Sequence, residues 1–292
     1  MKRILFLLLL AIGFGIPSFS QDISHGKVVE GLSFESKILK QPVSYALYFP
    51  PDYDASQRRY PVVYLLHGYS DNQSAWIQFG EINRIMDAGI ASGTIPPMIL
   101  VMPNAKVTWY VNDYTGKVRY EDMFIQEFIP FIDASYNTRP TREFRAVAGL
   151  SMGGYGALIY GFKHPDLFSA CAGLSAAVLT EKEIKGRLST DTYDLDSVYG
   201  PMVSDSLPQH WYSNSVLTII ENIDPAKVSN LRIWLDCGDD DHLARGNSAL
   251  HILLLDKGIA HEYRVRDGGH TWNYWRTGIG PALEFVGQGF HR

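Results

Sequence analysis

Residues 144–158 join a short apolar run, a serine flanked by glycines and the start of a helix-competent segment. The run Phe144–Ala148 has a β-branched valine at its centre, which favours a buried strand. Gly-Leu-Ser-Met-Gly follows at 149–153, and then comes a helix-competent segment at 155–162. A serine in such a tight turn needs neighbours without bulky side chains two residues away. The pattern predicts that Ser151 is a nucleophile, lifted clear of the edge of a sheet.

Short apolar runs alternate with helix-competent segments along the rest of the chain. This order is typical of a mostly parallel sheet with helices on both faces, so the expected fold class is α/β. Strands are expected at 62–66, 98–102, 144–148, 168–174, 231–237 and 261–266, with antiparallel strands within 33–49. Helices are expected at 76–88, 121–134, after Ser151, at 247–257 and at the C-terminal end.

The domain organisation expected from these segments is a single α/β domain over residues 21–292. No internal repeat, linker or low-complexity tract divides it. The stretch 177–214 has no clear pattern and is interpreted as a cap-like insertion or long loop near the site. A chain of 292 residues with 46% hydrophobic and 20% charged residues is ordinary for a globular protein with a substantial core.

Residues 1–20 have the pattern of a secretory signal peptide. Lys2 and Arg3 precede the apolar stretch 4–12, and a small-residue exit at 17–20 ends before Gln21. Cleavage is therefore expected near Ser20, giving a secreted or periplasmic protein. No later segment approaches the roughly 20 apolar residues that a membrane-spanning helix needs, so no membrane association is expected after cleavage. The net charge of −5 and the absence of a basic run argue against nucleic-acid binding.

The two cysteines, Cys171 and Cys237, lie in apolar, strand-like runs. Buried free thiols are the favoured interpretation, with a disulfide as the alternative. Two cysteines without paired spacing offer no zinc site. No metal or other cofactor is expected.

A serine hydroxyl is a poor nucleophile until a positioned base takes its proton. In folds that place a nucleophilic serine in a tight turn between a strand and a helix, an acidic residue and then a histidine follow the serine along the chain, each on a loop after a later strand. Gly-Gly-His-Thr-Trp at 268–272 follows the last expected strand, and its glycines permit a tight turn that aims His270 at the sheet edge. His270 is therefore the predicted base.

Three consecutive aspartates follow the strand at 231–237, in Cys-Gly-Asp-Asp-Asp-His-Leu at 237–243. A carboxylate here would hold the imidazole tautomer and stabilise its positive charge. The spacing alone does not decide which aspartate points inward. Metal binding by these aspartates is the weaker alternative, because consecutive residues rarely converge on one ion.

The strand at 62–66 ends in His67-Gly68-Tyr69. The backbone N–H of Tyr69 is predicted to converge with that of Met152 on the oxyanion that forms during acyl transfer. His67 lies at the strand end before a glycine and is interpreted as a brace for this loop.

Four of these motifs, taken together and in this order, resemble an esterase family of α/β-hydrolases. They are Leu-His-Gly at 66–68, Gly-Leu-Ser-Met-Gly-Gly at 149–154, Cys-Gly-x-x-Asp at 237–241, and Gly-His-x-Trp-x-x-Trp at 269–275. The family includes the feruloyl and acetylxylan esterases of carbohydrate esterase family one, S-formylglutathione hydrolase and the mycobacterial mycolyltransferases. The resemblance extends over about residues 30–288. It implies the α/β-hydrolase fold, Ser151 as nucleophile, His270 as base, Asp241 as acid, and the amides of Tyr69 and Met152 as oxyanion donors.

The same resemblance implies hydrolysis of carboxylic esters through an acyl-serine. A secreted esterase is expected to act on ester-decorated plant polysaccharide, as a feruloyl or acetylxylan esterase. The alternatives are an acyltransferase to a sugar acceptor and a thioesterase similar to S-formylglutathione hydrolase. Five aromatic residues expected to border the site could stack on a ferulate ring or a sugar, with packing of the loops as the alternative: Trp76, Trp109, Tyr110, Tyr114 and Trp272.

Overall fold

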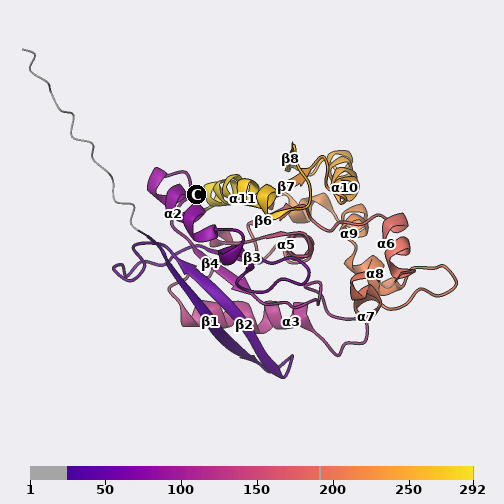
Figure 1. Ribbon diagram of the computed structural model, residues 1–292, viewed down its shortest axis with the longest axis horizontal. Helices are drawn as coiled ribbons and strands as arrows, with labels where there is room; N and C mark the ends of the chain where they lie inside the picture. The colour runs from indigo at the N-terminus through magenta and orange to yellow at the C-terminus, as the bar shows by residue number, and fades with distance from the viewer. Residues whose placement is uncertain (1–24, 191, 292) are drawn as a thin grey trace, which may run out of the picture.

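The computed structural model describes residues 25–190 and 192–291. The predicted signal peptide lies outside the described residues. One eight-stranded sheet runs through the molecule in the order β1-β2-β4-β3-β5-β6-β7-β8 (Figure 1). Strands β1 (Lys27–Ser36) and β2 (Gln41–Phe49) pair antiparallel at one edge, and β2 pairs antiparallel with β4.

The other six strands are parallel, so their carboxyl ends meet at one edge of the sheet. In β3, alternate residues pack on opposite faces: Tyr64 joins one hydrophobic core and Leu65 the other. This two-sided burial explains why the central parallel strands are almost continuously apolar, whereas the edge strand β8 (Glu262–Arg266) is partly exposed and carries charged residues. The six strands are β3 (Val62–Leu66), β4 (Ile99–Pro103), β5 (Arg145–Leu150), β6 (Ala170–Leu174), β7 (Arg232–Gly238) and β8 (Glu262–Arg266).

Helices cover both faces of the sheet, which confirms the expected α/β class. Figure 1 shows α2 (Ile82–Ser92) beside α11 (Trp272–Gln288), and both pack on the core that contains Leu65. The core on the other face includes side chains from α5 (Met152–Lys163), α9 (Val216–Asn222) and α10 (Ala244–Asp256). It also includes α3 (Tyr120–Met123), the π-helical turn η1 (Phe124–Phe128) and α4 (Ile129–Ser135).

Two helices differ from their predicted form. The segment predicted as one helix over 76–88 is broken into α1 (Ala75–Gln78) and α2, because Glu81 adopts a left-handed conformation with φ of 52°. The helix predicted over 121–134 is continuous, but its middle turn is π-helical. Neither change moves a predicted site residue.

The stretch 177–214 contains several short helices, so it is not a long irregular loop; its interpretation as a cap-like insertion stays a prediction. It contains α6 (Glu181–Leu188), the short turn η3 (Thr192–Asp194), α7 (Leu195–Tyr199) and α8 (Gln209–Asn214). Figure 1 shows α6, α7 and α8 gathered at the end of the molecule away from β1 and β2. Another short turn, η4 (Pro225–Val228), leads towards β7, and η5 (Gly289–His291) follows α11.

Cys171 and Cys237 are both buried and free, which confirms the favoured interpretation over a disulfide. Burial raises the pKa of each thiol. Within the part of the chain that the structure describes, no helix has the length and apolar character to cross a membrane.

Candidate active site

Ser151 occupies the turn between β5 and α5 in the predicted geometry. Its backbone has φ of 52° and ψ of −117°, a conformation that side chains rarely adopt. A Cβ atom on Gly149 would collide with the carbonyl of Gly153, and one on Gly153 would collide with the carbonyl of Leu66. The two glycines therefore let the strand, the turn and the helix pack closely enough to hold Ser151 at the carboxyl end of the sheet.

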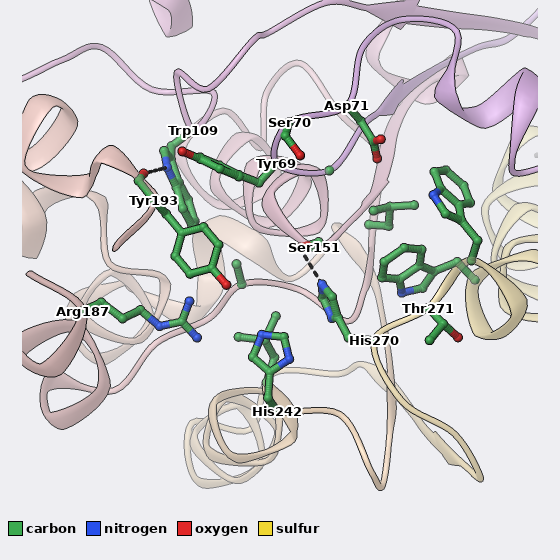
Figure 2. Close-up of a pocket in the computed structure, with 16 residues that line it drawn as sticks. Tyr69, Ser70, Asp71, Trp109, Ser151, Arg187, Tyr193, His242, His270 and Thr271 are labelled. Carbon is green, nitrogen blue, oxygen red and sulfur yellow. Dashed lines mark hydrogen bonds between the residues drawn. The ribbon is translucent and has the colours of Figure 1, made fainter. Parts of the chain in front are cut away.

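Figure 2 shows the imidazole of His270 pointing at Ser151. The His270 Nε2 atom lies 2.9 Å from Ser151 Oγ. The His270 Nδ1 atom lies 2.9 Å from Asp241 Oδ2 and 3.1 Å from Oδ1. Because Nδ1 faces a carboxylate, it carries the proton and donates it, which leaves Nε2 free to accept the serine proton. The structure thus brings together the three side chains predicted as nucleophile, base and acid.

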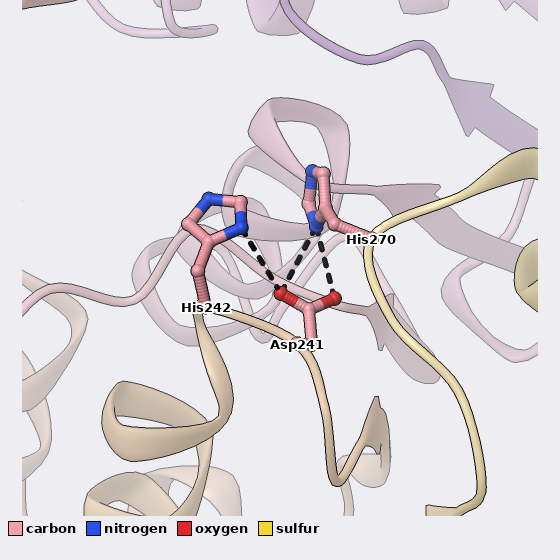
Figure 3. A group of neighbouring side chains, drawn as sticks. All are labelled: Asp241, His242 and His270. Carbon is pink, nitrogen blue, oxygen red and sulfur yellow. Dashed lines mark hydrogen bonds and ion pairs between the residues drawn. The ribbon is translucent and has the colours of Figure 1, made fainter.

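Asp241 is the only one of the three consecutive aspartates with its carboxylate against His270 (Figure 3). Asp239 accepts hydrogen bonds from backbone N–H groups, including that of Gly268, and both Asp239 and Asp240 are exposed. Burial acts to raise the pKa of Asp241. Hydrogen bonds from His270, Ser175 and the N–H of Leu243 outweigh burial and hold that pKa below its usual range.

Ser175 and Trp275 support the acid, and sequence reasoning missed the role of both. Ser175 is fully buried just after β6, with a left-handed φ of 44°. Its hydroxyl accepts a hydrogen bond of 3.0 Å from Trp275 Nε1 and helps to lower the pKa of the Asp241 carboxyl. The Trp275 ring also packs edge-on against His270, with 4.8 Å between centroids. The second tryptophan of the Gly-His-x-Trp-x-x-Trp motif was the available signal.

The loop after β3 is braced by His67, as the sequence predicted. His67 is buried; its Nδ1 donates to the Gly68 carbonyl at 2.8 Å and its Nε2 accepts the N–H of Ala105 at 2.9 Å. Burial lowers the pKa of His67 to about 4, so the ring is neutral. The loop places Tyr69 at the pocket that also contains Ser151, and Met152 begins α5 directly after Ser151. The oxyanion role of these two amides stays a prediction.

A pocket of about 350 Å³ opens beside the Ser151–His270 pair. Of the five aromatic residues predicted to bind substrate, Trp109 and Trp272 line it. Its other lining residues come from the loop after β3, the turn between β5 and α5, the segment 177–214, the loop after β7, and the loop and first turn of α11 around His270: Gly68, Tyr69, Ser70, Asp71, Leu150, Ser151, Ala177, Arg187, Tyr193, His242, Leu243, His270, Thr271 and Trp275.

The other three aromatic residues lie elsewhere, which corrects the prediction for them. Trp76 is 1% exposed and donates its Nε1 hydrogen to the Leu66 carbonyl. Tyr110 is fully buried and donates its hydroxyl to the His67 carbonyl at 2.9 Å. Tyr114 is exposed but lines a separate hollow with Val111. Buried rings such as Trp76 and Tyr110 have no free face for a substrate.

Two pocket residues that the sequence did not single out are charged. Arg187 lies on α6, and Asp71 lies in the loop after β3. Burial raises the pKa of the Asp71 carboxyl, although a hydrogen bond from the Gly68 N–H acts in the opposite direction. The pocket therefore combines an aromatic wall with one basic and one acidic side chain.

Some of the acidic and histidine side chains lie close enough to hold a metal ion. Asp241, His242 and His270 form one such group, and the exposed Asp239, Asp240 and Asp267 form another, with ligand atoms within 4.8 Å of one another. In the first group His242 Nδ1 lies 3.6 Å from Asp241 Oδ1 (Figure 3). An ion there would compete with the hydrogen bond between Asp241 and His270.

The family model described as "Putative esterase" matches residues 36–286, which is most of the chain. The chain belongs to this esterase family. Its relatives include an acetyl esterase from Caldicellulosiruptor saccharolyticus, which is 27% identical over 267 residues that cover 88% of this chain and 97% of the relative.

A ferulic acid esterase of known structure is 31% identical and has a TM-score of 0.80, with 91% of this chain and 99% of that chain covered. An endo-1,4-beta-xylanase/feruloyl esterase from Xylanibacter ruminicola is 33% identical over 175 residues. That match covers 58% of this chain and 24% of the longer relative.

These matches, together with the mostly parallel sheet, make the fold that of the α/β-hydrolases. They also make this esterase-family member an enzyme, a carboxylic ester hydrolase.

Proposed function

We propose that this chain is a secreted serine esterase that releases acyl groups from ester-decorated plant polysaccharide through an acyl-serine intermediate. The observation that supports the mechanism is the unbroken hydrogen-bonded path from Asp241 through His270 to Ser151, at 2.9 Å for each step. Secretion is supported by the signal pattern of residues 1–20.

In the acylation step, Ser151 Oγ attacks the ester carbonyl carbon while its proton passes to His270 Nε2. Asp241 holds the proton on Nδ1 and stabilises the imidazolium that forms. The negative oxygen of the tetrahedral intermediate accepts hydrogen bonds from the amides of Tyr69 and Met152. The carbon–oxygen bond to the alcohol then breaks, the alcohol takes the proton from His270, and the acyl group stays on Ser151.

The deacylation step repeats this chemistry with water. His270 takes a proton from a water molecule as its oxygen attacks the acyl-serine carbonyl. When the second tetrahedral intermediate collapses, Ser151 leaves with the proton from His270 and the carboxylic acid is released. No group beyond the triad, the two amides and water is needed for the balance of atoms.

The substrate class rests on the pocket wall and on the relatives. Trp272 lines the pocket and is partly exposed, and aromatic faces stack on both sugars and aryl rings; Trp109 also lines the pocket but is only 3% exposed. The relatives described above are an acetyl esterase, a ferulic acid esterase and a xylanase/feruloyl esterase. Acetyl and feruloyl esters of xylan are therefore the proposed substrates.

The mechanism is tested with Ser151→Ala and a chromogenic ester, p-nitrophenyl acetate. We expect kcat to fall by more than about a thousandfold, because the nucleophile is lost and only binding and oxyanion stabilisation remain. Ser213→Ala is the matched control, since Ser213 is exposed on α8 and lies outside the pocket lining. Equal rates for the wild-type protein and Ser151→Ala would contradict the mechanism.

The substrate class is tested by assaying the wild-type protein on acetylated xylan and on methyl ferulate side by side. Release of acetate or ferulate at rates well above those of Ser151→Ala supports the proposal. Adding an acceptor sugar separates hydrolysis from acyl transfer, because a transferase forms the acylated sugar rather than the free acid.

A further inference from the structure

Arg187 brings a positive charge to the pocket beside the triad. It lies in the last turn of α6, partly buried, and lines the pocket together with Tyr193 and His242. Figure 2 shows its guanidinium reaching from α6 towards the space between these two side chains, on the side of the pocket where Tyr69 and Trp109 lie.

The aromatic neighbours of Arg187 hold its surroundings in place. Its Cζ atom lies 5.2 Å from the centroid of the Tyr193 ring. The Tyr193 carbonyl accepts a hydrogen bond of 3.4 Å from Trp109 Nε1, and the Tyr193 ring packs edge-on against Tyr69 at 5.1 Å. These contacts join η3 to the loops that follow β3 and β4. The guanidinium is therefore presented beside a ring that is tied to the rest of the pocket wall.

No carboxylate within residues 25–190 and 192–291 forms an ion pair with Arg187. The nearest acidic residue on the same helix, Glu183, is committed to Thr180, whose backbone N–H donates to it at 2.9 Å and whose hydroxyl donates at 2.7 Å. Glu183 also lies 4.0 Å from Arg245. The Arg187 guanidinium, with its planar fork of donors, is thus available to an anionic group of a ligand.

Charge is distributed unevenly across the pocket. Figure 2 shows Asp71 on the opposite side of Ser151 from Arg187. A substrate carboxylate would be attracted at the Arg187 end and repelled at the Asp71 end when Asp71 is ionised. The two side chains together favour one orientation of an anionic substrate.

We infer that Arg187, with Tyr193, forms a carboxylate-binding subsite, so that the enzyme prefers esters carrying a carboxylate at some distance from the scissile bond. On a polysaccharide, such a group is the carboxylate of an acidic sugar near the ester. This inference rests on the proposed function, because it concerns the substrate of the same site. The competing explanation is that Arg187 only complements the carboxyl end of α6, as basic residues in a last turn often do.

The test compares rigid esters that differ only in charge. Monomethyl terephthalate and methyl 4-carbamoylbenzoate place a carboxylate or a neutral amide on the acyl side. 4-Acetoxybenzoate and 4-acetoxybenzamide do so on the alcohol side. Binding to Ser151→Ala is measured by calorimetry, so that turnover is not needed, and kcat/KM is measured separately with Ser151 intact.

We expect Ser151→Ala to bind the carboxylate member of at least one pair about tenfold more tightly than its amide, as a charge-assisted hydrogen bond would give. Adding R187Q should abolish this ratio, and adding R187K should leave an intermediate one, because lysine keeps the charge but loses the planar fork. Arg245→Gln is the matched control and should keep the full ratio, since Arg245 is an exposed arginine on α10 outside the pocket lining. Raising the salt concentration should reduce the ratio without any mutation.

Equal binding of carboxylate and amide in both pairs would overturn the subsite, as would a preference that survives R187Q or an absence of binding by all four esters. A carboxylate preference in binding, without hydrolysis of any ester by the unmutated enzyme, would leave the subsite standing and overturn the proposed function instead.

Discussion

At the scale of single residues, Asp241, the proposed catalytic acid, has a buried serine behind it. Ser175 accepts a hydrogen bond from Trp275 and helps to lower the pKa of the Asp241 carboxyl. It is fully buried, so its hydrogen bonds are not replaced by water if the hydroxyl is removed. Ser175 is therefore a positioning residue: it acts on the reaction only through Asp241.

Ser175→Ala is expected to lower kcat about tenfold, because it removes a hydroxyl that stabilises the charged form of Asp241, an effect worth about 1.5 kcal/mol. KM for p-nitrophenyl acetate should change by less than about twofold. The reason is that the support that Ser175 gives to Asp241 matters mainly in the transition state, when His270 becomes charged. The measurement is steady-state kinetics with circular dichroism on the same samples.

Two variants separate this role from a general loss of structure. Ser175→Cys keeps a weak donor and should fall between the wild-type protein and Ser175→Ala. Ser213→Ala removes an exposed hydroxyl on α8 and should behave as the wild type. A fall in kcat that only matches a loss of folded protein would rule out the positioning role.

The sequence pointed to the three residues of the proposed triad but not to all of their surroundings. The order of Ser151, Asp241 and His270 is visible because each follows a strand whose apolar pattern is clear. The sequence pattern does not show in this way which aromatic rings are exposed at the pocket. Trp76 and Trp272 were both expected to border the site, yet Trp76 is buried against Trp272, with 5.3 Å between their ring centroids. Which ring reaches the pocket is decided by tertiary packing, which has no local signature.

At the scale of elements, α6 carries the pocket residue Arg187 and begins with a capping box. The Thr180 side chain accepts the N–H of Glu183, and the Glu183 carboxylate accepts the N–H of Thr180. These reciprocal bonds satisfy backbone donors that a helix start leaves unpaired. On the buried side, Ile184 and Leu188 anchor the helix to the core one turn apart.

Thr180→Ala is expected to lower the free energy of unfolding by about 1 kcal/mol, the usual cost of losing a threonine cap. Because α6 carries Arg187, fraying of its first turn should also raise KM for the carboxylate-bearing esters described above. Thermal unfolding and steady-state kinetics are the measurements. Lys182→Ala is the control, since Lys182 is exposed on the same helix; an equal loss of stability in both variants would argue against the cap.

Strands were predicted better than helices in this chain for a physical reason. The parallel strands β3, β4, β5 and β6 are buried along their whole length, so each appears as a short apolar run that few other structures produce; the edge strand β8 is an exception. The helices between 177 and 214 are short and present only one or two buried positions per turn. The sequence Thr-x-x-Glu at 180–183 was the signal that would have identified the start of α6.

At the scale of the whole molecule, the parallel strands converge on one edge of the sheet, and the loops there must be held together across strands. His67 provides one such link, because its ring bonds the loop after β3 to the backbone of Ala105 after β4. The order of strands placed these two loops side by side. The sequence predicts where the strands lie along the chain but not their order in the sheet, because strand pairing depends on contacts between residues that are distant in sequence.

The neutral state of His67 makes the stability of the fold depend on pH. Its pKa is about 4 in the folded protein, against an ordinary value of 6.5 in the unfolded chain. Between these two values the unfolded chain binds more protons than the folded one, so the free energy of unfolding falls as the pH is lowered through this window. The loss amounts to about 3 kcal/mol across the window if His67 acts alone.

His67→Gln keeps one donor and one acceptor but does not titrate, so other ionisable groups cancel when the two proteins are compared. The difference in the free energy of unfolding between the wild type and His67→Gln should therefore shift by about 3 kcal/mol between pH 7 and pH 4, in the direction that favours the variant at low pH. Urea unfolding at several pH values measures this difference. Nuclear magnetic resonance of the His67 ring gives an independent check: a ring that becomes protonated near pH 6.5 in the folded protein, or a difference that does not change with pH, would show that burial of this histidine does not govern the acid sensitivity of the fold.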